Sequence, residues 1–134
     1  DFYNSSFVLE YLTERKIDLI ALAGFLWLVP GSLIEKFTIV NIHPALLPKY
    51  GGKNMYGHYV HQAVINNREK FSGVTIHYVN EKYDDGAIIF QTQCTVEPED
   101  NPETLASKIH LLEYEHYPRI IEQVILSLPA VKYC

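Results

Sequence analysis

The sequence predicts an α/β fold: an open, Rossmann-like sheet, mixed but mostly parallel, flanked by helices. One observation is the run of large aliphatic residues at Ile17–Ala23, which directly follows a helical segment and is typical of a parallel strand buried on both faces. Another is that strand-like and helix-like segments alternate after it, as in open α/β sheets. With 134 residues, 48% of them hydrophobic, the chain is expected to form a single domain over residues 1–134.

In the first half of the chain, helix-capping residues and the spacing of apolar residues indicate where helices and strands begin and end. Ser5 and Ser6 are suitable caps for a first helix, and Pro30 suits the first turn of a short one. Between them, Gly24–Val29 is expected to form a turn lined with large apolar side chains. The expected elements, in the order helix, strand, helix, strand, are Phe7–Lys16, Ile17–Ala23, Pro30–Glu35 and Thr38–Asn41.

The second half is expected to contain a helix, two antiparallel strands and a final helix. Polar and apolar residues alternate in the first of these strands, which should therefore have two unlike faces. Pro118 is expected to break or kink the final helix. The helix before the strands should turn Tyr59, Val60, Ala63 and Val64 inward. The expected bounds are Gly57–Asn67, Gly73–Val79, Ala87–Val96 and, after a cap at Asp100 or Asn101, a helix to about Leu126.

Composition excludes several classes of protein. The formal net charge of −5 argues against a protein that works on nucleic acid or anionic membranes. No apolar run approaches the roughly 18 residues of a membrane-spanning helix, and no signal peptide opens the chain. Cys94 and Cys134 make no disulfide framework, so a cytoplasmic location is expected. His58 and His61 share a helix face without a third ligand at a suitable spacing, so they are expected to be surface or packing residues and no metal is expected.

The end of the Thr38–Asn41 strand leads into a loop that reads Asn-Ile-His-Pro-Ala-Leu-Leu-Pro-Lys-Tyr-Gly-Gly from residue 41 to residue 52. In an extended chain, residues two apart point to the same face, so Asn41 and His43 should project together. Pro44 holds His43 in extended geometry. An amide beside an imidazole at the end of a buried strand suggests a site that handles a carbonyl group. On residue type alone, a turn cap at Asn41 and a satisfied polar His43 is the simpler interpretation.

This stretch closely resembles the signature of the folate-dependent formyltransferases, and within them most of all the enzymes that formylate glycinamide ribonucleotide (GAR). A second block, Val79–Gly86, resembles the folate loop of that family and ends in its Asp-x-Gly pattern. The resemblance runs from about Ser5 to Ile125. It implies transfer of a formyl group from the co-substrate 10-formyltetrahydrofolate to the amine of 5′-phosphoribosylglycinamide in purine (IMP) biosynthesis. Enzymes that formylate methionyl-tRNA or hydrolyse formyltetrahydrofolate, and a non-catalytic folate-binding fragment, are the alternatives.

The resemblance implies three catalytic residues, Asn41, His43 and Asp84. Transfer of a formyl group between nitrogens passes through a tetrahedral intermediate, which needs donors to its oxyanion and a proton carrier. Asn41 would donate its amide N–H, and a protonated His43 would be the second donor and the acid for the leaving nitrogen. Asp84 would keep His43 protonated by raising its pKa. Asp85 is the alternative partner, although the Asp-x-Gly pattern favours Asp84.

The resemblance also implies the residues that bind the two substrates. The expected folate-binding residues are Leu26, Trp27, Leu28, Val29, Asn41, Asn80, Glu81, Lys82, Tyr83 and Asp84. The expected GAR-binding residues are Pro44, His110, Leu111, Leu112 and Glu113, with Glu113 placed for the ribose hydroxyls. On residue type alone, Leu26–Val29 are equally explained as core and Glu113 as a solvated surface residue. Trp27 stands where many members of the family carry an arginine.

The family opens with a strand and a loop that cradles the ribonucleotide phosphate, and no matching segment is found in this sequence. The chain is therefore expected to represent the C-terminal two-thirds of a formyltransferase catalytic domain. Without a neighbouring strand, Leu19–Ala23 would present an unpaired edge, so self-association through that edge is expected. The other expected partners are small-molecule substrates, with neither nucleic acid nor membrane among them.

Overall fold

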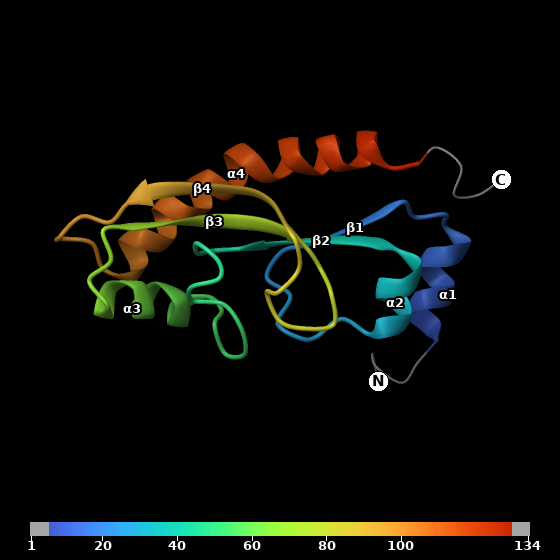
Figure 1. The fold of residues 1–134 in the computed structure, drawn as a ribbon, viewed down its shortest axis with the longest axis horizontal. Coiled ribbons are helices and arrows are strands. Elements are labelled where there is room, and N and C mark those ends of the chain that lie inside the picture. Colours follow the sequence, from blue (N-terminus) through green and yellow to red (C-terminus); the bar gives the residue numbers. More distant parts are fainter. Residues whose placement is uncertain (1–5, 130–134) are drawn as a thin grey trace.

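The computed structural model describes residues 6–129, which form helices packed around a four-stranded sheet (Figure 1). Each element expected from the sequence is present, within two residues of its expected bounds. The elements are α1 (Phe7–Glu14), β1 (Leu19–Leu22), α2 (Gly31–Lys36), β2 (Thr38–His43), α3 (His58–Asn66), β3 (Phe71–Tyr78), β4 (Ile88–Thr95) and α4 (Pro102–Ser127).

The strands lie side by side in the order β1-β2-β3-β4. β1 and β2 are parallel, whereas β2–β3 and β3–β4 are antiparallel. The open, mixed α/β sheet is therefore confirmed, although only one of the pairings in the described residues is parallel. The register between β2 and β3 sets Asn41 opposite His77 and His43 opposite Thr75. Because paired residues share a face of the sheet, these four side chains lie on the same side.

Alternate residues of β2 face two different apolar clusters. Val40 and Ile42 point into the main core between the sheet, α3 and α4, and Ile39 points to a smaller cluster with α1 and α2. Figure 1 shows α4 along one side of the sheet and α1 and α2 gathered on the other. Asn41 and His43 follow Ile39 at intervals of two, so they project from the face of the smaller cluster, beyond its apolar residues. The fold thus leaves two polar side chains at the carboxyl end of a buried strand.

Burial of the strands differs from the expectation in two places. Leu19, Ile20 and Leu22 of β1 are only half-buried and Ala21 is exposed, because within residues 6–129 this strand pairs with β2 alone and lies at the sheet edge. The expectation of burial on both faces was therefore wrong for this chain. β3 was expected to have two unlike faces, yet every residue from 72 to 77 is buried. Strands on both sides of β3 and cover on both of its faces explain the difference.

The inner face of α3 is also shifted from the expected one. Val60, His61 and Val64 are buried, whereas Tyr59 is 58% exposed. The spacing of three and four residues is that of a helix face, but the face is centred one residue later than expected. His61 is therefore on the inner side of α3 and not on its surface.

Helix α4 begins at a capping box and reaches across the whole sheet. The Asn101 side chain accepts a hydrogen bond from the Thr104 backbone N–H, and the Thr104 hydroxyl accepts one from the Asn101 N–H, both at 2.9 Å. The helix continues through Pro118 without the expected break. Just before Pro118, the Tyr117 hydroxyl donates to the Leu22 carbonyl at 2.6 Å, which ties the helix to the end of β1.

None of the helices between residues 6 and 129 has the length and apolar character needed to cross a membrane.

Candidate functional site

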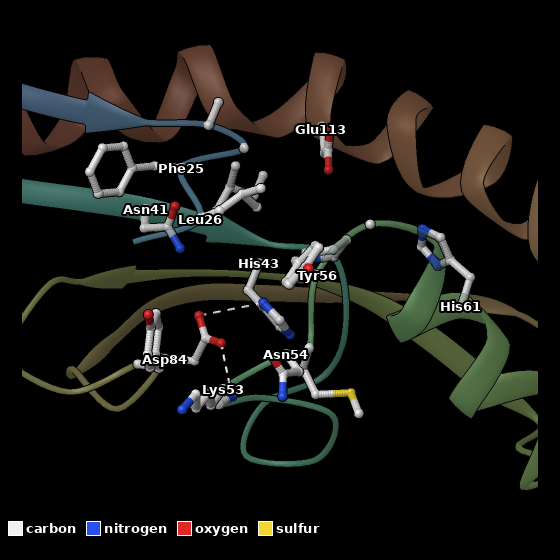
Figure 2. Close-up of a pocket in the computed structure, with 18 of the residues that line it drawn as sticks. Phe25, Leu26, Asn41, His43, Lys53, Asn54, Tyr56, His61, Asp84 and Glu113 are labelled. Carbon is white, nitrogen blue, oxygen red and sulfur yellow. Dashed lines mark hydrogen bonds and ion pairs between the residues drawn. The ribbon is translucent and has the colours of Figure 1, made fainter. Parts of the chain in front are cut away.

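Asn41 and His43 occupy the carboxyl end of β2 and project from one face, as expected (Figure 2). The strand continues to His43, two residues beyond its expected end, so the chain is extended through both positions. His43 is buried at 3% exposure, and Asn41 is half-buried. An amide and an imidazole are thereby fixed side by side on the backbone of a central strand.

Both ring nitrogens of His43 face acceptors. Nε2 donates to the Tyr50 carbonyl oxygen at 2.7 Å, and Nδ1 lies 3.4 Å from Oδ1 of Asp84. The doubly protonated imidazolium is therefore the form that satisfies both contacts. Burial opposes that charge and lowers the pKa of His43 below its ordinary value, although Asp84 and the Tyr50 carbonyl act to raise it. Asp84 thus acts on the pKa of His43 in the expected direction, but burial has the larger effect and the net shift is downward.

Asp84 is the carboxylate beside His43. Its Oδ2 accepts a hydrogen bond from the Gly52 backbone N–H at 3.0 Å, which joins the two loops that flank the site. Burial acts to raise the pKa of Asp84, but the imidazoles of His77 and His43 and the Gly52 N–H outweigh it and lower the pKa. Asp85 is exposed, and its carboxylate contacts the Asn80 side chain instead. The geometry therefore selects Asp84 as the neighbour of His43.

The Asp-x-Gly pattern has a steric reason in this fold. Asp84 has a φ of +50°, a left-handed conformation that side chains other than Asn and Asp seldom adopt. Two residues later, a Cβ added to Gly86 would lie 1.6 Å from the Tyr78 carbonyl oxygen. The loop can return to the end of β3 only if residue 86 has no side chain. Gly86 thus sets how closely Asp84 approaches β2.

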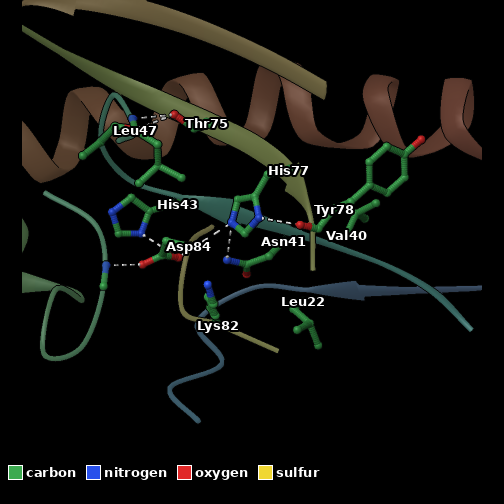
Figure 3. A network of polar contacts seen from close by, with 12 residues as sticks. Leu22, Val40, Asn41, His43, Leu47, Thr75, His77, Tyr78, Lys82 and Asp84 are labelled. Carbon is green, nitrogen blue, oxygen red and sulfur yellow. Dashed lines mark hydrogen bonds and ion pairs between the residues drawn. The ribbon is translucent and has the colours of Figure 1, made fainter. Parts of the chain in front are cut away.

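His77 is a member of the site that sequence reasoning did not single out. Its Nδ1 donates to the Tyr78 carbonyl oxygen at 2.9 Å, and its Nε2 lies 3.2 Å from the Asn41 amide nitrogen and 3.7 Å from Oδ1 of Asp84 (Figure 3). The alternation of polar residues in β3 placed it on one face of that strand. Only the register with β2 brings it to Asn41, and no local pattern encodes that register.

A buried hydroxyl holds the loop that follows His43. Thr75 is fully buried, its hydroxyl donates to the Ala45 carbonyl oxygen at 2.7 Å, and it accepts from the Leu47 backbone N–H at 3.1 Å. The Gln91 side-chain amide donates to the same hydroxyl at 2.9 Å and to the Leu47 carbonyl at 3.0 Å. This network links β3 and β4 to residues 45–47, and it fixes the direction in which the chain leaves the site.

The site opens into a cavity of about 480 Å³ (Figure 2). Its walls come from the end of β2, the turn after β1, the Gly52–Gly57 loop, the Asp84 loop and α4. Of the expected site residues, those that line it are Leu26, Asn41, His43, Pro44, Tyr83, Asp84, His110 and Glu113. The lining residues that sequence reasoning missed include Phe25, Lys53, Asn54, Tyr56 and His61. The loop that supplies most of these has no regular structure, so periodicity gave no signal for it.

Several expected folate-binding residues line a smaller hollow on the other side of Asn41. This hollow shares Asn41, Tyr83 and Asp84 with the cavity and also contacts Trp27, Leu28, Val29, Asn80 and Lys82. The large indole of Trp27 is 61% exposed and packs edge-on against Phe25. The two spaces meet at Asn41 and Asp84, so molecules bound in both spaces would meet beside these two side chains.

Three expected site residues lie outside both spaces. Glu81 is exposed, Leu111 is 68% exposed on the surface of α4, and Leu112 packs against the main core. The reason is helical geometry: in α4 the cavity-facing residues His110 and Glu113 are three apart, and the two residues between them point elsewhere.

Two titratable groups in the cavity wall, the half-buried Glu113 and the buried His61, are not neutralised by an oppositely charged partner. Burial raises the pKa of Glu113, which His110 only partly offsets. His61 has a buried Nδ1 without a hydrogen-bond partner in the structure, and burial together with the neighbouring imidazoles of His110, His58 and His43 lowers its pKa to about 4. Among residues 6–129, no group of three or more His, Cys, Asp or Glu side chains is arranged to hold a metal ion.

The arrangement offers the parts needed to stabilise an oxyanion and to move a proton. The Asn41 amide is a neutral hydrogen-bond donor, and His43 is a buried imidazole beside the carboxylate of Asp84. These groups sit in a partly water-excluded cavity, where donor dipoles act more strongly than in water. Such a set suits the transfer of an acyl or formyl group.

Comparisons with known proteins agree with this chemistry. The family model described as "Formyl transferase" matches residues 4–121. The chain is 42% identical over 123 residues to phosphoribosylglycinamide formyltransferase, chloroplastic, of Arabidopsis thaliana, a match that covers 90% of this chain and 42% of the relative. It is 37% identical over 120 residues to phosphoribosylglycinamide formyltransferase of Bacillus subtilis, covering 88% of this chain and 59% of the relative. The chain thus spans about half the length of these curated relatives.

Solved structures give the same result. The crystal structure of phosphoribosylglycinamide formyltransferase from Bacillus halodurans is similar with a TM-score of 0.83 at 34% identity, covering 98% of this chain and 69% of that one. Glycinamide ribonucleotide transformylase 1 from Geobacillus kaustophilus is similar with a TM-score of 0.80 at 36% identity, covering 90% of this chain and 62% of that one.

Proposed function

The chain belongs to the formyl transferase family, and from this premise we propose that it carries the catalytic groups for transfer of the formyl group of 10-formyltetrahydrofolate to the amine of 5′-phosphoribosylglycinamide, in purine biosynthesis. The observation that carries the proposal is the convergence of Asn41, His43 and Asp84 at the meeting point of two binding spaces. The names of the relatives from Arabidopsis thaliana and Bacillus subtilis support the choice of acceptor.

In the proposed reaction the GAR amine attacks the formyl carbon, a new C–N bond forms, and the carbonyl oxygen becomes an oxyanion. Asn41 donates an amide N–H to that oxygen. The negative charge also favours protonation of His43, whose pKa is otherwise held down by burial. His43 is therefore charged mainly when the oxyanion is present, so its stabilisation is specific to the transition state. The amine proton passes through the His43–Asp84 pair to the folate nitrogen as the old C–N bond breaks.

The same proposal assigns the two spaces. The hollow beside Asn41 that reaches Trp27 and Val29 has a volume of about 40 Å³ and walls that are polar and apolar in nearly equal parts, so it would receive only one edge of the folate ring system. The cavity that reaches His110 and Glu113 would hold the ribonucleotide. Glu113 suits ribose hydroxyls, because a desolvated carboxylate without a cation is stabilised by hydrogen-bond donors.

The acceptor is tested by a formyl-transfer assay that follows the folate product with GAR, with methionyl-tRNA or with water as the acceptor. Both the 134-residue chain and the protein made from its full open reading frame should be assayed. Transfer to GAR in either form, absent in Asn41→Ala, is the expected result. Transfer to methionyl-tRNA, or hydrolysis without transfer, would contradict the proposed acceptor. Folate binding without turnover in both forms would favour a non-catalytic role.

The partners and location belong to the same proposal. Because β1 is an edge strand in the described residues, with half-buried Leu19, Ile20 and Leu22, the 134-residue chain should self-associate through it. A monomer by size-exclusion chromatography would contradict this. We place the protein in the cytoplasm, although the Arabidopsis relative is named chloroplastic. Cell fractionation distinguishes the two locations.

A further inference from the structure

We propose that His77 is a positioning residue that sets which way the Asn41 carboxamide faces. This inference rests on the proposed function, because it assigns the oxyanion donor to one particular N–H group of Asn41. His77 is 2% exposed and sits directly opposite Asn41 in the β2–β3 register. Its two ring nitrogens make two different contacts, and together these contacts determine the orientation of the amide (Figure 3).

The first contact fixes the tautomer of His77. Nδ1 lies 2.9 Å from the carbonyl oxygen of Tyr78, and a carbonyl can only accept, so Nδ1 carries the proton. In a neutral imidazole the other nitrogen is then an acceptor. The Tyr78 carbonyl is held in place because the backbone N–H of the same residue donates to Ala87 at 2.9 Å. The tautomer is thus set by backbone at the end of β3 and not by a mobile side chain.

The second contact transmits that choice to Asn41. An acceptor at Nε2 of His77 requires a donor opposite it, and the Asn41 amide nitrogen lies 3.2 Å away. One N–H of Asn41 is used in this bond, which leaves the second N–H for a ligand in the cavity. If the amide were rotated by half a turn, its oxygen would face the lone pair of Nε2, and Asn41 would offer an acceptor to His77 and no donor to an oxyanion.

The two neighbours of His77 Nε2 make opposite demands: the Asp84 carboxylate favours a proton on this nitrogen, whereas the Asn41 amide favours a lone pair. Oδ1 of Asp84 is 3.7 Å from that nitrogen, too long for a hydrogen bond, while it is nearer to His43 at 3.4 Å. If Nε2 carried a proton, two donors, Nε2–H and the Asn41 amide, would face one another at 3.2 Å. No single protonation state of Nε2 therefore satisfies both Asn41 and Asp84. The contact with Asn41 is the shorter one, and it favours an Nε2 without a proton.

Two substitutions of His77 separate the two contacts. Glutamine places its side-chain oxygen near the position of Nε2 and keeps an acceptor for Asn41, whereas asparagine reaches only to the position of Nδ1 and removes it. We expect His77→Asn to lower kcat by about tenfold to hundredfold with little change in KM, and His77→Gln to recover most of that loss. The exposed His58, which lines neither space, supplies the matched control as His58→Asn, with unchanged kcat.

A double-mutant cycle shows whether His77 acts through Asn41. In the Asn41→Ala background, His77→Asn should cause no further loss of kcat, because the group that it orients is gone. Fully additive losses would overturn the inference. Thermal unfolding of each variant identifies a loss that arises from misfolding, and His77→Gln remains informative if His77→Asn does not fold.

A second measurement does not depend on turnover. Nitrogen-15 NMR of the histidine side chains should show His77 as the neutral Nδ1–H tautomer near neutral pH. An Nε2–H tautomer or an imidazolium would overturn the inference even if GAR transfer is confirmed. Conversely, if no formyl transfer is found but the Nδ1–H tautomer is seen with a protected Asn41 amide, the geometric inference stands and the proposed function fails.

Discussion

The carboxylate of Asp84 joins two loops around His43: one oxygen lies 3.4 Å from Nδ1 of His43, and the other accepts the Gly52 N–H at 3.0 Å. The contact to the imidazole is longer than the roughly 2.7–2.9 Å of a charge-assisted hydrogen bond. The pair is therefore loosely engaged, as is common in unliganded catalytic sites.

Replacing Asp84 by Asn should lower the pKa of His43 further, because the carboxylate is the main influence that raises it against burial. Transfer activity should fall most at neutral and higher pH, where protonation of His43 is hardest. NMR titration of His43 in both forms measures the effect. Asp85→Asn is the matched control, and equal titration of His43 in wild type and Asp84→Asn would exclude the assigned role.

Removal of either side chain at the end of β2 should affect the reaction rate far more than the fold. For Asn41→Ala or His43→Ala, we expect transfer to fall by about 10²–10³, the usual cost of losing one oxyanion donor. Circular dichroism and the unfolding midpoint check that the fold is kept. Turnover close to that of wild type in either variant would show that the residue is not catalytic.

Thr75→Val should destabilise the chain by about 1–3 kcal/mol, since it leaves the buried Leu47 N–H without its acceptor and the buried Ala45 carbonyl without its donor. Valine matches threonine in shape, so packing changes little. Urea unfolding measures the effect. Thr95→Val, at an exposed position of β4, is the control and should be near neutral.

Gly86→Ala should displace the Asp84 loop, because the added methyl group would overlap the Tyr78 carbonyl oxygen. Both stability and transfer rate are expected to fall, and the His43 NMR signals should shift as Asp84 moves away. Gly31→Ala is the matched control: its Cβ would meet Glu81 at an ordinary 3.6 Å. Unchanged His43 signals in Gly86→Ala would contradict the steric explanation of the Asp-x-Gly pattern.

Stability should fall as pH decreases from 6.5 toward about 4, because His61 titrates near 4 in the folded chain and near its ordinary 6.5 when unfolded. In that window the unfolded chain binds more protons, so acid favours unfolding. His43 acts in the same direction. Urea unfolding across this range should show a shallower pH dependence for His61→Leu than for wild type. Parallel curves would exclude the assignment.

Local patterns were sufficient for the elements and for part of the site. The shared face of Asn41 and His43 follows from strand geometry alone, and the capping residues located α4. What depends on contacts distant in sequence was missed. His77 reaches Asn41 through a strand register, and the burial of β1 depends on which strands lie beside it. The net shift in the pKa of His43 also depends on how deeply its ring is buried, which no local pattern gives.

The bond from the Tyr117 hydroxyl to the Leu22 carbonyl has a mechanical consequence. Tyr117 stands one helical turn after Glu113, so the cavity wall that carries Glu113 is braced against the same pair of strands that carries Asn41. The distance between these two walls is therefore set by a helix and a pair of strands. For the proposed ribonucleotide, the length of the site would be set by these elements, and only the loops at the sides could adapt to its width.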